Sequence, residues 1–484
     1  MNRIFFIFFL FNLNAGILHC QPPTDVYQQF DDAEFFYSTE EYEEALYLFQ
    51  QLYRDYPENH NLNFKIGMCY LNIPGQERNA IKYFEKAVDN TTLKYKEHDF
   101  TIKKAPHHAW FYLGNAYRIN NELDKALDSY IKFQDIRNFE KKYNLAIVQN
   151  EVNACERAKI IQDNPINLVL KNLGESINTG VKAYQPVVNR SESVLAFMQE
   201  QRFYDAIMFS EKVNGQWTVP VNITPQVGSD GDMVPAAFSD DGKSLLLIKR
   251  TNSSDGDIYI SKREGNLWNI AKPLDKNINS SRDEAHASFS EDGNQIILSS
   301  ARRGGYGGLD LYTSYLKTDG TWTLPQNLGE LINTEYDESS AFLMNGGKTL
   351  YFTSRGHFNM GGYDIFFSNL DENGKWTDPV NIGYPLNTTN DNSFYQPVGN
   401  GNSGYIALFG QEANFGEEDI YRIEVLPFTG PKVPEKAMFD EDFTILIENE
   451  ESGEIIELKY DRKTDQIILN SNQKTKLKWT LKKR

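Results

Sequence analysis

The first third of the chain carries apolar side chains at the spacing of helices that pack in pairs. Over residues 26–163, small and aromatic residues recur together, and three similar segments can be aligned: 26–59, 60–94 and 107–140. Small residues let two helices approach closely, and aromatic residues fill the layer between neighbouring pairs. The pattern therefore predicts three helix pairs, followed by a further helix over 139–162 that caps the stack.

The spacing within these segments resembles the tetratricopeptide repeat (TPR), a helix–turn–helix unit of 34 residues. The matching residues are Ala33, Phe36, Ala45, Phe49 and Pro57; Gly67, Tyr70, Ala80, Phe84 and Ala87; and Trp110, Leu113, Gly114, Tyr117, Ala126, Tyr130 and Phe133. The resemblance implies a groove that holds an extended protein segment. Residues 92–106 interrupt the repeats and are predicted to form an elongated loop.

Phenylalanine occupies the fifth position of each repeat, as Phe30, Phe64 and Phe111. In TPR arrays this position tends to face the groove, so the three rings could form an apolar stripe for a partner. Aromatic residues at helical spacing are just as typical of a packed core. The sequence leaves both interpretations open. The resemblance gives no support for a carboxylate clamp, because its Lys and Asn residues are missing here.

From residue 164 onward the pattern changes to the alternation of short β-strands. One strand pattern recurs as "GDIYIS", "LDLYTS", "YDIFFS" and "EDIYRI", with a weaker copy in "YDAIMFS". The aspartates of these copies, 52 to 55 residues apart, are Asp205, Asp257, Asp310, Asp364 and Asp419. In chain order, a strand with a tryptophan follows every copy except the last, "EDIYRI". Asp-Gly or Gly-Gly turns upstream of the copies indicate hairpins. Each unit is therefore predicted to hold four strands.

Four-stranded units repeated around a ring form a β-propeller. We predict a five-bladed propeller over residues 164–428. The fifth unit lacks its tryptophan strand, whereas residues 166–177, "INLVLKNLGESI", resemble that strand in the third unit. We therefore expect residues 166–173 to supply the outer strand of the fifth blade and to close the ring.

A glycine-rich loop precedes the aspartate in the third unit, where residues 302–310 read "RRGGYGGLD". A phosphate-binding G-x-G-x-x-G loop would open a helix and would need a third glycine where Asp310 stands. We predict instead that the glycines allow a tight turn and that the repeated aspartates are structural, accepting backbone N–H groups. Arg302 and Arg303 in this loop, and Arg355 in the next unit, are candidates for partner binding.

The sequence contains no GxSxG, HExxH or CxxC motif. Five-bladed propellers also occur in glycoside hydrolases, which place carboxylates around the central channel. A carbohydrate-active enzyme or a glycan-binding module is therefore the alternative. A catalytic pair should be asymmetric, whereas the repeated aspartates are equivalent. We predict no catalytic residue, no metal and no cofactor.

The N-terminal residues 1–20 predict export, because an arginine precedes a phenylalanine-rich apolar run. The alternative is a lipid anchor on Cys20. Cys69 and Cys155 lie in predicted helices and are expected to pack rather than react. The chain has 49 basic and 67 acidic residues and a net charge of −18, which disfavours nucleic-acid binding. No later segment is apolar enough to predict a membrane span.

Residues 429–484 predict a linker followed by a small β domain. Four alternating patterns, "FTILIEN", "GEIIELKYD", "DQIILNS" and "KLKWTLKK", are separated by turn signals. These strands could form a separate domain or stack against the propeller. A sixth blade is not expected, because the tryptophan and aspartate marks of the repeat are absent.

The β units resemble the WD40-like, TolB-type propeller repeat of bacterial envelope proteins over residues 168–426. The motif is "G-x-D-[IL]-[YF]-x-S" followed by "W-x-x-P-x-[NL]". Together with residues 1–20 and 21–163, the order resembles envelope scaffolds of the Bacteroidetes, including components linked to type IX secretion and gliding. Many of these continue into an OmpA-like peptidoglycan-binding domain, which residues 429–484 do not resemble, so direct peptidoglycan anchoring is not expected.

The resemblance implies an exported, non-enzymatic scaffold of the periplasm or the outer membrane. Its partners would be envelope proteins bound by the TPR groove and by one face of the propeller, or a glycan, but not a nucleic acid.

Overall fold

The computed structural model describes residues 26–250, 256–411 and 413–426, together with the backbone of three short strands beyond them. The predicted signal peptide and Cys20 lie outside the described residues. The chain divides into two units, Met1–Leu426 and Pro427–Arg484.

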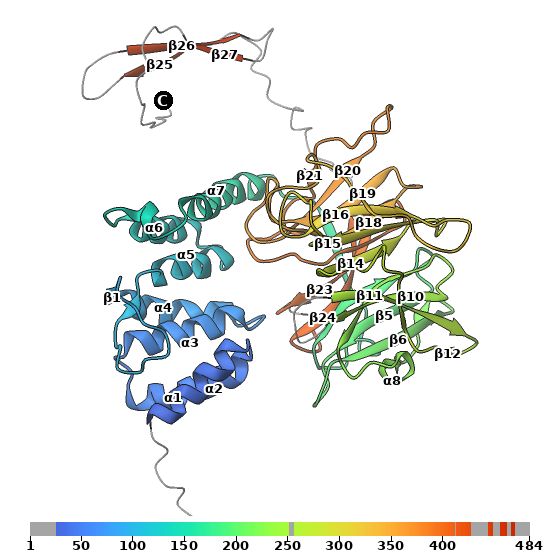
Figure 1. Cartoon of the computed structure of the whole chain (residues 1–484), viewed down its shortest axis with the longest axis horizontal. Coiled ribbons are helices and arrows are strands. Elements are labelled where there is room, and N and C mark those ends of the chain that lie inside the picture. Colours follow the sequence, from blue (N-terminus) through green and yellow to red (C-terminus); the bar gives the residue numbers. More distant parts are fainter. Residues whose placement is uncertain are drawn as a thin grey trace, which may run out of the picture. The chain divides into compact units, whose positions relative to one another are not determined.

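The described part of the first unit begins with helices arranged in consecutive pairs (Figure 1). The pairs are α1 (Val26–Ser38) with α2 (Tyr42–Asp55), α3 (His60–Asn72) with α4 (Ala80–Val88), and α5 (Ala109–Ile119) with α6 (Leu123–Gln134). The capping helix α7 (Leu145–Gln162) follows. The three predicted pairs and the cap are thus confirmed. The cap begins later than predicted, because Phe139–Lys141 form a separate 3-10 turn, η2.

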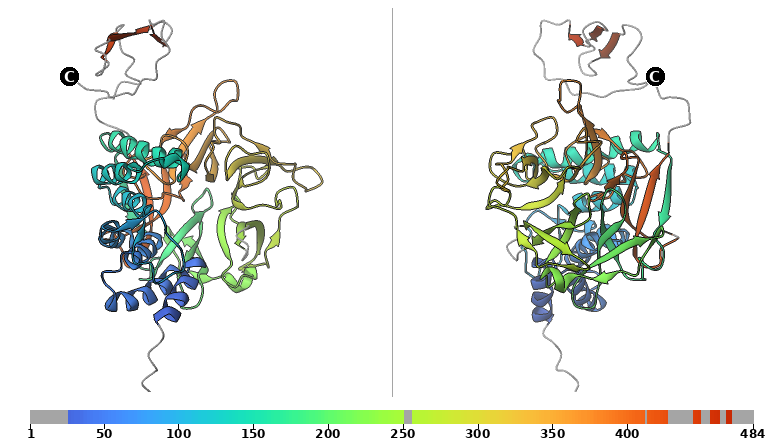
Figure 2. Two further views of the ribbon diagram at one scale, coloured as in Figure 1. Left: turned by 60° about the vertical axis from the view of Figure 1, so that its left-hand side comes forward. Right: turned by 90° about the vertical axis from the view of Figure 1, so that its right-hand side faces the viewer.

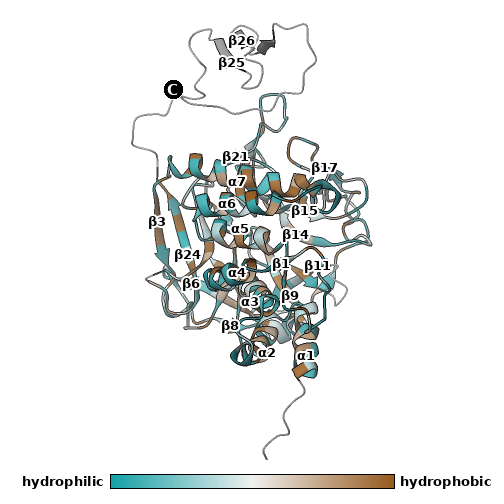
Figure 3. Ribbon diagram, turned by 90° about the vertical axis from the view of Figure 1, so that its left-hand side faces the viewer, coloured by the Kyte–Doolittle hydropathy of each residue, from teal (hydrophilic) through white to brown (hydrophobic). Residues whose placement is uncertain are grey.

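Close packing within the pairs depends on the small residues of the repeat. A Cβ atom on Gly114 would lie 2.4 Å from the ring of Tyr130, and one on Gly67 would lie 2.8 Å from the ring of Phe84. Each helix mixes hydrophobic and hydrophilic residues along its length (Figure 3), as expected where one side of a helix is buried. Cys69 and Cys155 are free and buried, so the prediction that they pack is confirmed.

The propeller consists of five antiparallel sheets arranged around a ring (Figure 2, left). Each of the first four blades begins with three strands that are consecutive in sequence. These are β4 (Ala183–Val188), β5 (Val194–Gln199) and β6 (Ala206–Val213); β9 (Met233–Phe238), β10 (Ser244–Arg250) and β11 (Gly256–Glu264); β14 (Glu284–Phe289), β15 (Gln295–Ser300) and β16 (Asp310–Tyr315); and β18 (Glu338–Met344), β19 (Thr349–Ser354) and β20 (Asp364–Asn369).

The fourth strand of these blades is interrupted rather than continuous. In the third blade it is reduced to β17 (Gln326–Asn327) and an isolated bridge at Trp322. Between these two contacts, side-chain hydrogen bonds link the outer edge of β16 to the interrupted strand. The Ser314 hydroxyl donates to the Thr323 carbonyl (2.7 Å), and the Tyr315 N–H donates to the Thr323 hydroxyl (3.0 Å). Satisfied edge groups do not invite pairing with another chain. The corresponding short strands are β7 (Gln216–Trp217), β8 (Val221–Asn222), β12 (Leu267–Trp268), β13 (Lys272–Pro273) and β21 (Val380–Asn381).

The fifth blade joins the two ends of the propeller. Its inner strands are β22 (Gln396–Val398), β23 (Ser403–Phe409) and β24 (Glu418–Val425), and its outer strand is β3 (Leu168–Asn172). β3 pairs with β24 in antiparallel register along its whole length, from Asn172 opposite Tyr421 to Leu168 opposite Val425. The predicted closure of the ring by residues 166–173 is therefore confirmed.

The second unit contains a three-stranded antiparallel sheet in the order β25 (Thr444–Glu448), β26 (Ile455–Asp461) and β27 (Gln466–Leu469). These strands match the first three predicted patterns. The predicted linker and the fourth strand pattern lie outside the described residues.

Candidate interaction surfaces

The loop between the second and third strands of a blade, here called the BC loop, is fixed by the repeated aspartate in the third, fourth and fifth blades. In the third blade the Asp310 carboxylate accepts hydrogen bonds from the backbone N–H groups of Tyr306 (2.7 Å) and Gly307 (3.0 Å) and from the Asn327 amide (2.6 Å). The turn is also tight, because a Cβ on Gly307 would lie 2.0 Å from the Tyr336 carbonyl oxygen. These are the contacts expected of a structural aspartate.

Asp419 repeats this arrangement in the fifth blade, where it accepts from the N–H groups of Phe415 (2.7 Å) and Gly416 (3.2 Å). Asp364 in the fourth blade accepts from the Met360 N–H (2.8 Å). Asp205 differs, because it accepts from the Tyr184 hydroxyl (2.5 Å) rather than from its own loop. Asp257, the repeated aspartate of the second blade, is half-buried at the start of β11.

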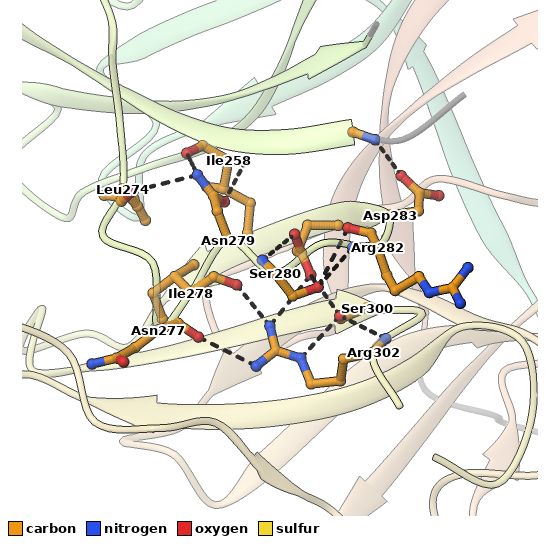
Figure 4. Close-up of polar contacts among 12 residues, drawn as sticks. Ile258, Leu274, Asn277, Ile278, Asn279, Ser280, Arg282, Asp283, Ser300 and Arg302 are labelled. Atoms are coloured by element: carbon orange, nitrogen blue, oxygen red, sulfur yellow. Dashed lines mark hydrogen bonds and ion pairs between the residues drawn. The ribbon is translucent and has the colours of Figure 1, made fainter. Parts of the chain in front are cut away.

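A second repeated residue, which the sequence analysis did not identify, binds the third strand in the second to fifth blades, whereas Thr224 binds the Ile207 N–H in the first. Asn279 accepts a hydrogen bond from the Ile258 N–H (2.8 Å) and donates one to the Ile258 carbonyl (3.0 Å), as Figure 4 shows. Asn333 and Asn387 make the same pair of bonds in the next two blades, as does Asn178 in the fifth. Asn279, Asn333 and Asn387 lie 54 residues apart, so their period was visible in the sequence.

Arg302 was predicted to bind a partner, but the structure places its guanidinium inside the junction between two blades. It donates to the carbonyls of Ile278 (2.7 Å) and Asn277 (3.3 Å), as Figure 4 shows. It also lies 3.4 Å from the Glu284 carboxylate. The side chain is 14% exposed. Buried carbonyls at the junction need a donor, which Arg302 supplies, so its guanidinium is engaged within the chain and its role in partner binding stays a prediction.

The other two candidate arginines lie at the surface. Arg303 is exposed. Arg355 is also exposed, lies over the ring of Tyr363 at 4.5 Å and approaches the Asp391 carboxylate at 3.4 Å. Both remain candidates for partner contacts.

The BC loop of the fourth blade is occupied by the chain's own helices. Met360 is fully buried and belongs to the hydrophobic core formed by α3 to α7. The guanidinium of Arg157 in α7 donates to the Asn359 carbonyl (2.9 Å) and to its side-chain oxygen (2.7 Å). This loop therefore binds a helical surface through one apolar side chain and one bidentate polar contact.

A buried arginine at the end of α5 completes this contact. The Arg118 Nε atom lies 2.9 Å from the Glu151 carboxylate, and its Nη1 atom donates to the Thr389 carbonyl. A Cβ on Gly361 would lie 2.2 Å from Nη1, so only glycine fits there. Burial raises the pKa of Asp364, at the base of this loop, to about 7, although Arg118 and Arg157 act in the opposite direction.

The helices also contact the fifth blade and the link to the first. The Asn390 amide donates to the Glu77 carboxylate (3.4 Å), and a Cβ on Gly75 would lie 2.8 Å from the Phe409 ring. Lys182 lies 3.9 Å from the Glu43 carboxylate of α2. The helical array thus covers loops of the fourth and fifth blades.

The BC loops of other blades present aromatic side chains to solvent. Phe203 in the first blade is 84% exposed, Tyr306 in the third is 52% exposed and Phe415 in the fifth is 49% exposed. Tyr306 and Phe415 hold the place that Met360 holds in the fourth blade, because each donates its N–H to the repeated aspartate.

The three phenylalanines of the helical repeats do not form an open stripe. Phe30 is 1% exposed and Phe64 is 4% exposed, and both belong to hydrophobic cores. Phe111 is half-buried and packs against the Tyr130 and Phe133 rings. Burial favours the core interpretation for Phe30 and Phe64 in this form of the chain, and their role in partner binding stays a prediction. The loop over residues 92–106 contributes to this burial, because Phe100 packs against Phe30 and Tyr95 packs against Phe64.

Three aromatic rings on or beside the innermost strands pack against one another. His286, Phe342 and Phe394 come from three blades, with ring centroids 5.0 to 6.0 Å apart. Burial lowers the pKa of His286 to about 4, so the ring is neutral near pH 7. At the end of the inner strands, Arg190 lies 3.5 Å from Asp240 and 3.2 Å from Glu291 in a pocket lined by residues of all five blades.

Within the described residues, no group of three His, Cys, Asp or Glu side chains is placed to hold a metal ion. In that same part of the chain, every helix is too short or too polar to cross a bilayer.

Comparison with known proteins gives matches to structure alone. No protein-family model matches the chain, and no curated protein sequence matches it significantly. TolB from Acinetobacter baumannii superposes with a TM-score of 0.32 at 15% identity, covering 59% of this chain and 74% of TolB.

Two glycoside hydrolases superpose to a similar extent. The GH62 α-L-arabinofuranosidase domain of Coprinopsis cinerea has a TM-score of 0.36 at 10% identity, covering 54% of this chain and 97% of its own. The α-L-arabinofuranosidase of Lactobacillus brevis has a TM-score of 0.36 at 12% identity, covering 61% and 96%. Values this low carry no functional argument, and the five-bladed fold rests on the strand pairing itself.

Proposed function

We propose that the protein is a non-enzymatic scaffold that binds other proteins through the BC-loop face of its propeller. The main support is that the BC loop of the fourth blade already packs against a protein surface, that of the chain's own helices. Met360 and Asn359 bind the helices α5 and α7, while the same loop frame offers exposed aromatic rings, Tyr306 and Phe415, in the third and fifth blades. Aromatic and arginine side chains are the residue types enriched at the centres of protein interfaces.

The proposal includes a location. The apolar N-terminal run of residues 1–20 supports export to the periplasm or the outer membrane, and the TPR-like spacing supports protein binding by the helices. A secretion or gliding-type assembly of a Bacteroidetes envelope is the setting that the sequence resemblance suggests.

The experiment places a photo-crosslinking amino acid in the full-length protein within its source cells. Tyr306 and Arg303 on the BC-loop face are the test positions. Leu324, 73% exposed on an outer strand segment, is the matched control. We expect discrete adducts from the test positions that are absent or at least about tenfold weaker from Leu324, because interface centres exclude solvent and hold one geometry. Equal adduct patterns at all three positions would contradict the proposal.

The alternative, a carbohydrate-active enzyme, is supported by one observation: Asp240 and Glu291 converge on Arg190 at the end of the channel. Most glycoside hydrolases use a pair of carboxylates, one as the general acid and one as the nucleophile or general base. A screen of glycan substrates tests this alternative. Hydrolysis that is lost in both Asp240→Asn and Glu291→Gln would favour the enzyme over the scaffold.

A further inference from the structure

The loop that interrupts the helical repeats is closed at its base. Thr91 and Thr92 pair in parallel with Ala105 and Pro106, and the His107 N–H donates to the Thr92 carbonyl (3.0 Å). The twelve residues between these two short strands, 93–104, are here called the insert. Its ends are thus held together while its middle is free to reach across the helices.

The insert lies across the first helix of successive pairs. The Tyr95 hydroxyl donates to the Asn61 side chain of α3 (2.8 Å), and the Tyr95 ring packs edge-on against Phe64 at 6.4 Å. Asn61 in turn donates its N–H to the Lys103 carbonyl (3.2 Å). The N-terminal part of α3 is therefore covered by both arms of the insert.

The far end of the insert covers α1. The Phe100 ring packs against Phe30 at 5.3 Å, Tyr27 at 5.9 Å and Tyr56 at 5.2 Å. These contacts account for the burial of Phe30, which stands at the repeat position expected to face the groove. Phe100 is itself only half-buried, so its outer side still meets solvent.

A charged contact lies between the two aromatic anchors. The His98 Nδ1 atom is 2.8 Å from the Glu34 carboxylate, which also pairs with the Lys65 ammonium at 3.0 Å. The Glu34 and Lys65 side chains are each 3% exposed, whereas His98 is 57% exposed. A buried ion pair is costly unless its remaining sites are used, and His98 uses one of them.

We propose that these helices form a binding groove for an extended protein segment, and that residues 93–104 occupy the groove in cis. The observed occupant defines the partner: an extended peptide with two aromatic side chains five residues apart and a cationic or imidazole side chain between them, directed at Glu34. This inference adds a second surface to the proposed function and rests on the same class of activity, protein binding.

The test uses the insert itself as the probe. In the full-length protein, residues 94–103 are replaced by a flexible Gly-Ser linker of about six residues, long enough to rejoin the paired strands. A fluorescent peptide with the sequence of residues 93–104, LKYKEHDFTIKK, is then titrated against this protein and against the unmodified chain. We expect saturable binding to the emptied groove, and binding at least about tenfold weaker to the unmodified chain, because there the site is filled.

Two further peptides test the predicted anchors. A Phe100→Ala peptide should bind about tenfold more weakly, because a buried ring contributes strongly to association. A Leu93→Ala peptide is the matched control, since Leu93 is 46% exposed in the chain, and it should bind as the parent peptide does. Equal binding of all peptides, or no binding to a linker variant with intact helical circular dichroism, would overturn the inference.

If the linker variant does not fold, full-length Phe100→Ala takes its place. The labelled peptide should then bind at least about threefold more tightly to this variant than to the unmodified chain. Equal affinities would overturn the inference. Failure here leaves the crosslinking result at Tyr306 and Arg303 unaffected, so the two proposals fail separately.

Discussion

The BC loops of the third and fourth blades have the same internal frame and opposite surroundings. In both, the repeated aspartate accepts the backbone N–H four residues upstream, from Tyr306 to Asp310 and from Met360 to Asp364. Tyr306 is 52% exposed, whereas Met360 is fully buried in the core of the helical array. The two loops thus share a backbone frame, while the side chain at this position faces solvent in the third blade and the helical core in the fourth.

The comparison extends to the polar group behind each loop. Arg302 donates to the Ile278 carbonyl in the third blade, and a His357 ring nitrogen lies 2.9 Å from the equivalent Ile332 carbonyl in the fourth. Burial lowers the pKa of His357, so the neutral ring is favoured as the donor. Equivalent carbonyls in two blades are thus hydrogen-bonded by two different types of side chain.

The largest effect should come from removing the buried cation beneath the fourth-blade loop. Arg118→Ala leaves Glu151 without its partner and the Thr389 carbonyl without its donor. We expect a loss of about 3 kcal/mol in the free energy of unfolding, measured by urea denaturation. Arg303→Ala in the exposed third-blade loop is the control and should cost less than about 0.5 kcal/mol. Similar losses in both variants would contradict the proposed difference between the loops.

Truncation of the equivalent side chains compares the two loops directly. Met360→Ala should destabilise the protein by about 2 kcal/mol, because it leaves a cavity in the helical core. Tyr306→Ala should change stability by less than about 0.5 kcal/mol, because its ring faces solvent. Urea midpoints of the two variants check the prediction, and a larger loss for Tyr306→Ala would reverse the assignment of the docked loop.

A further effect depends on pH. Burial raises the pKa of Asp364 from 3.8 to about 7. Between these values the folded state keeps a proton that the unfolded chain has released, so this residue's contribution to stability falls as the pH rises through that window. Asp364→Asn removes the effect. Measured by urea denaturation at about pH 4.5 and 7.5, the variant should gain at least about 1 kcal/mol relative to the unmodified chain across the window, since each pKa unit corresponds to about 1.4 kcal/mol. Parallel pH profiles would show that Asp364 keeps an ordinary pKa.

The repetitive features of the fold could be predicted because each leaves a period in the sequence. The helix pairs follow from residues such as Gly67 and Gly114, and the blades follow from the aspartates at 52 to 55 residues. Closure by β3 was predicted because its sequence resembles the strand that the last unit lacks. The asparagines at blade junctions have a period too, and they were missed only because their role depends on a backbone partner in another strand.

The contacts that occur once could not be predicted in this way. Phe100 packs on Phe30 from a loop outside the repeats, and Met360 looks like any other loop residue until a helix covers it. The contacts of Arg302 were missed for a related reason: a glycine-rich loop follows it in the sequence, whereas the carbonyls that its guanidinium reaches belong to a distant turn. Single long-range contacts leave no pattern along the chain.

The strand that closes the ring has a mechanical consequence. α7 ends at Gln162 and β3 begins at Leu168, so only a few residues separate the helical array from the outer strand of the fifth blade. A pulling force applied to the helices would reach the β3–β24 pairing directly, where five residue pairs share the load. Tension between the helices and the propeller would therefore load the strand that holds the ring together, alongside the contacts of Met360, Arg118 and Arg157 at the fourth blade.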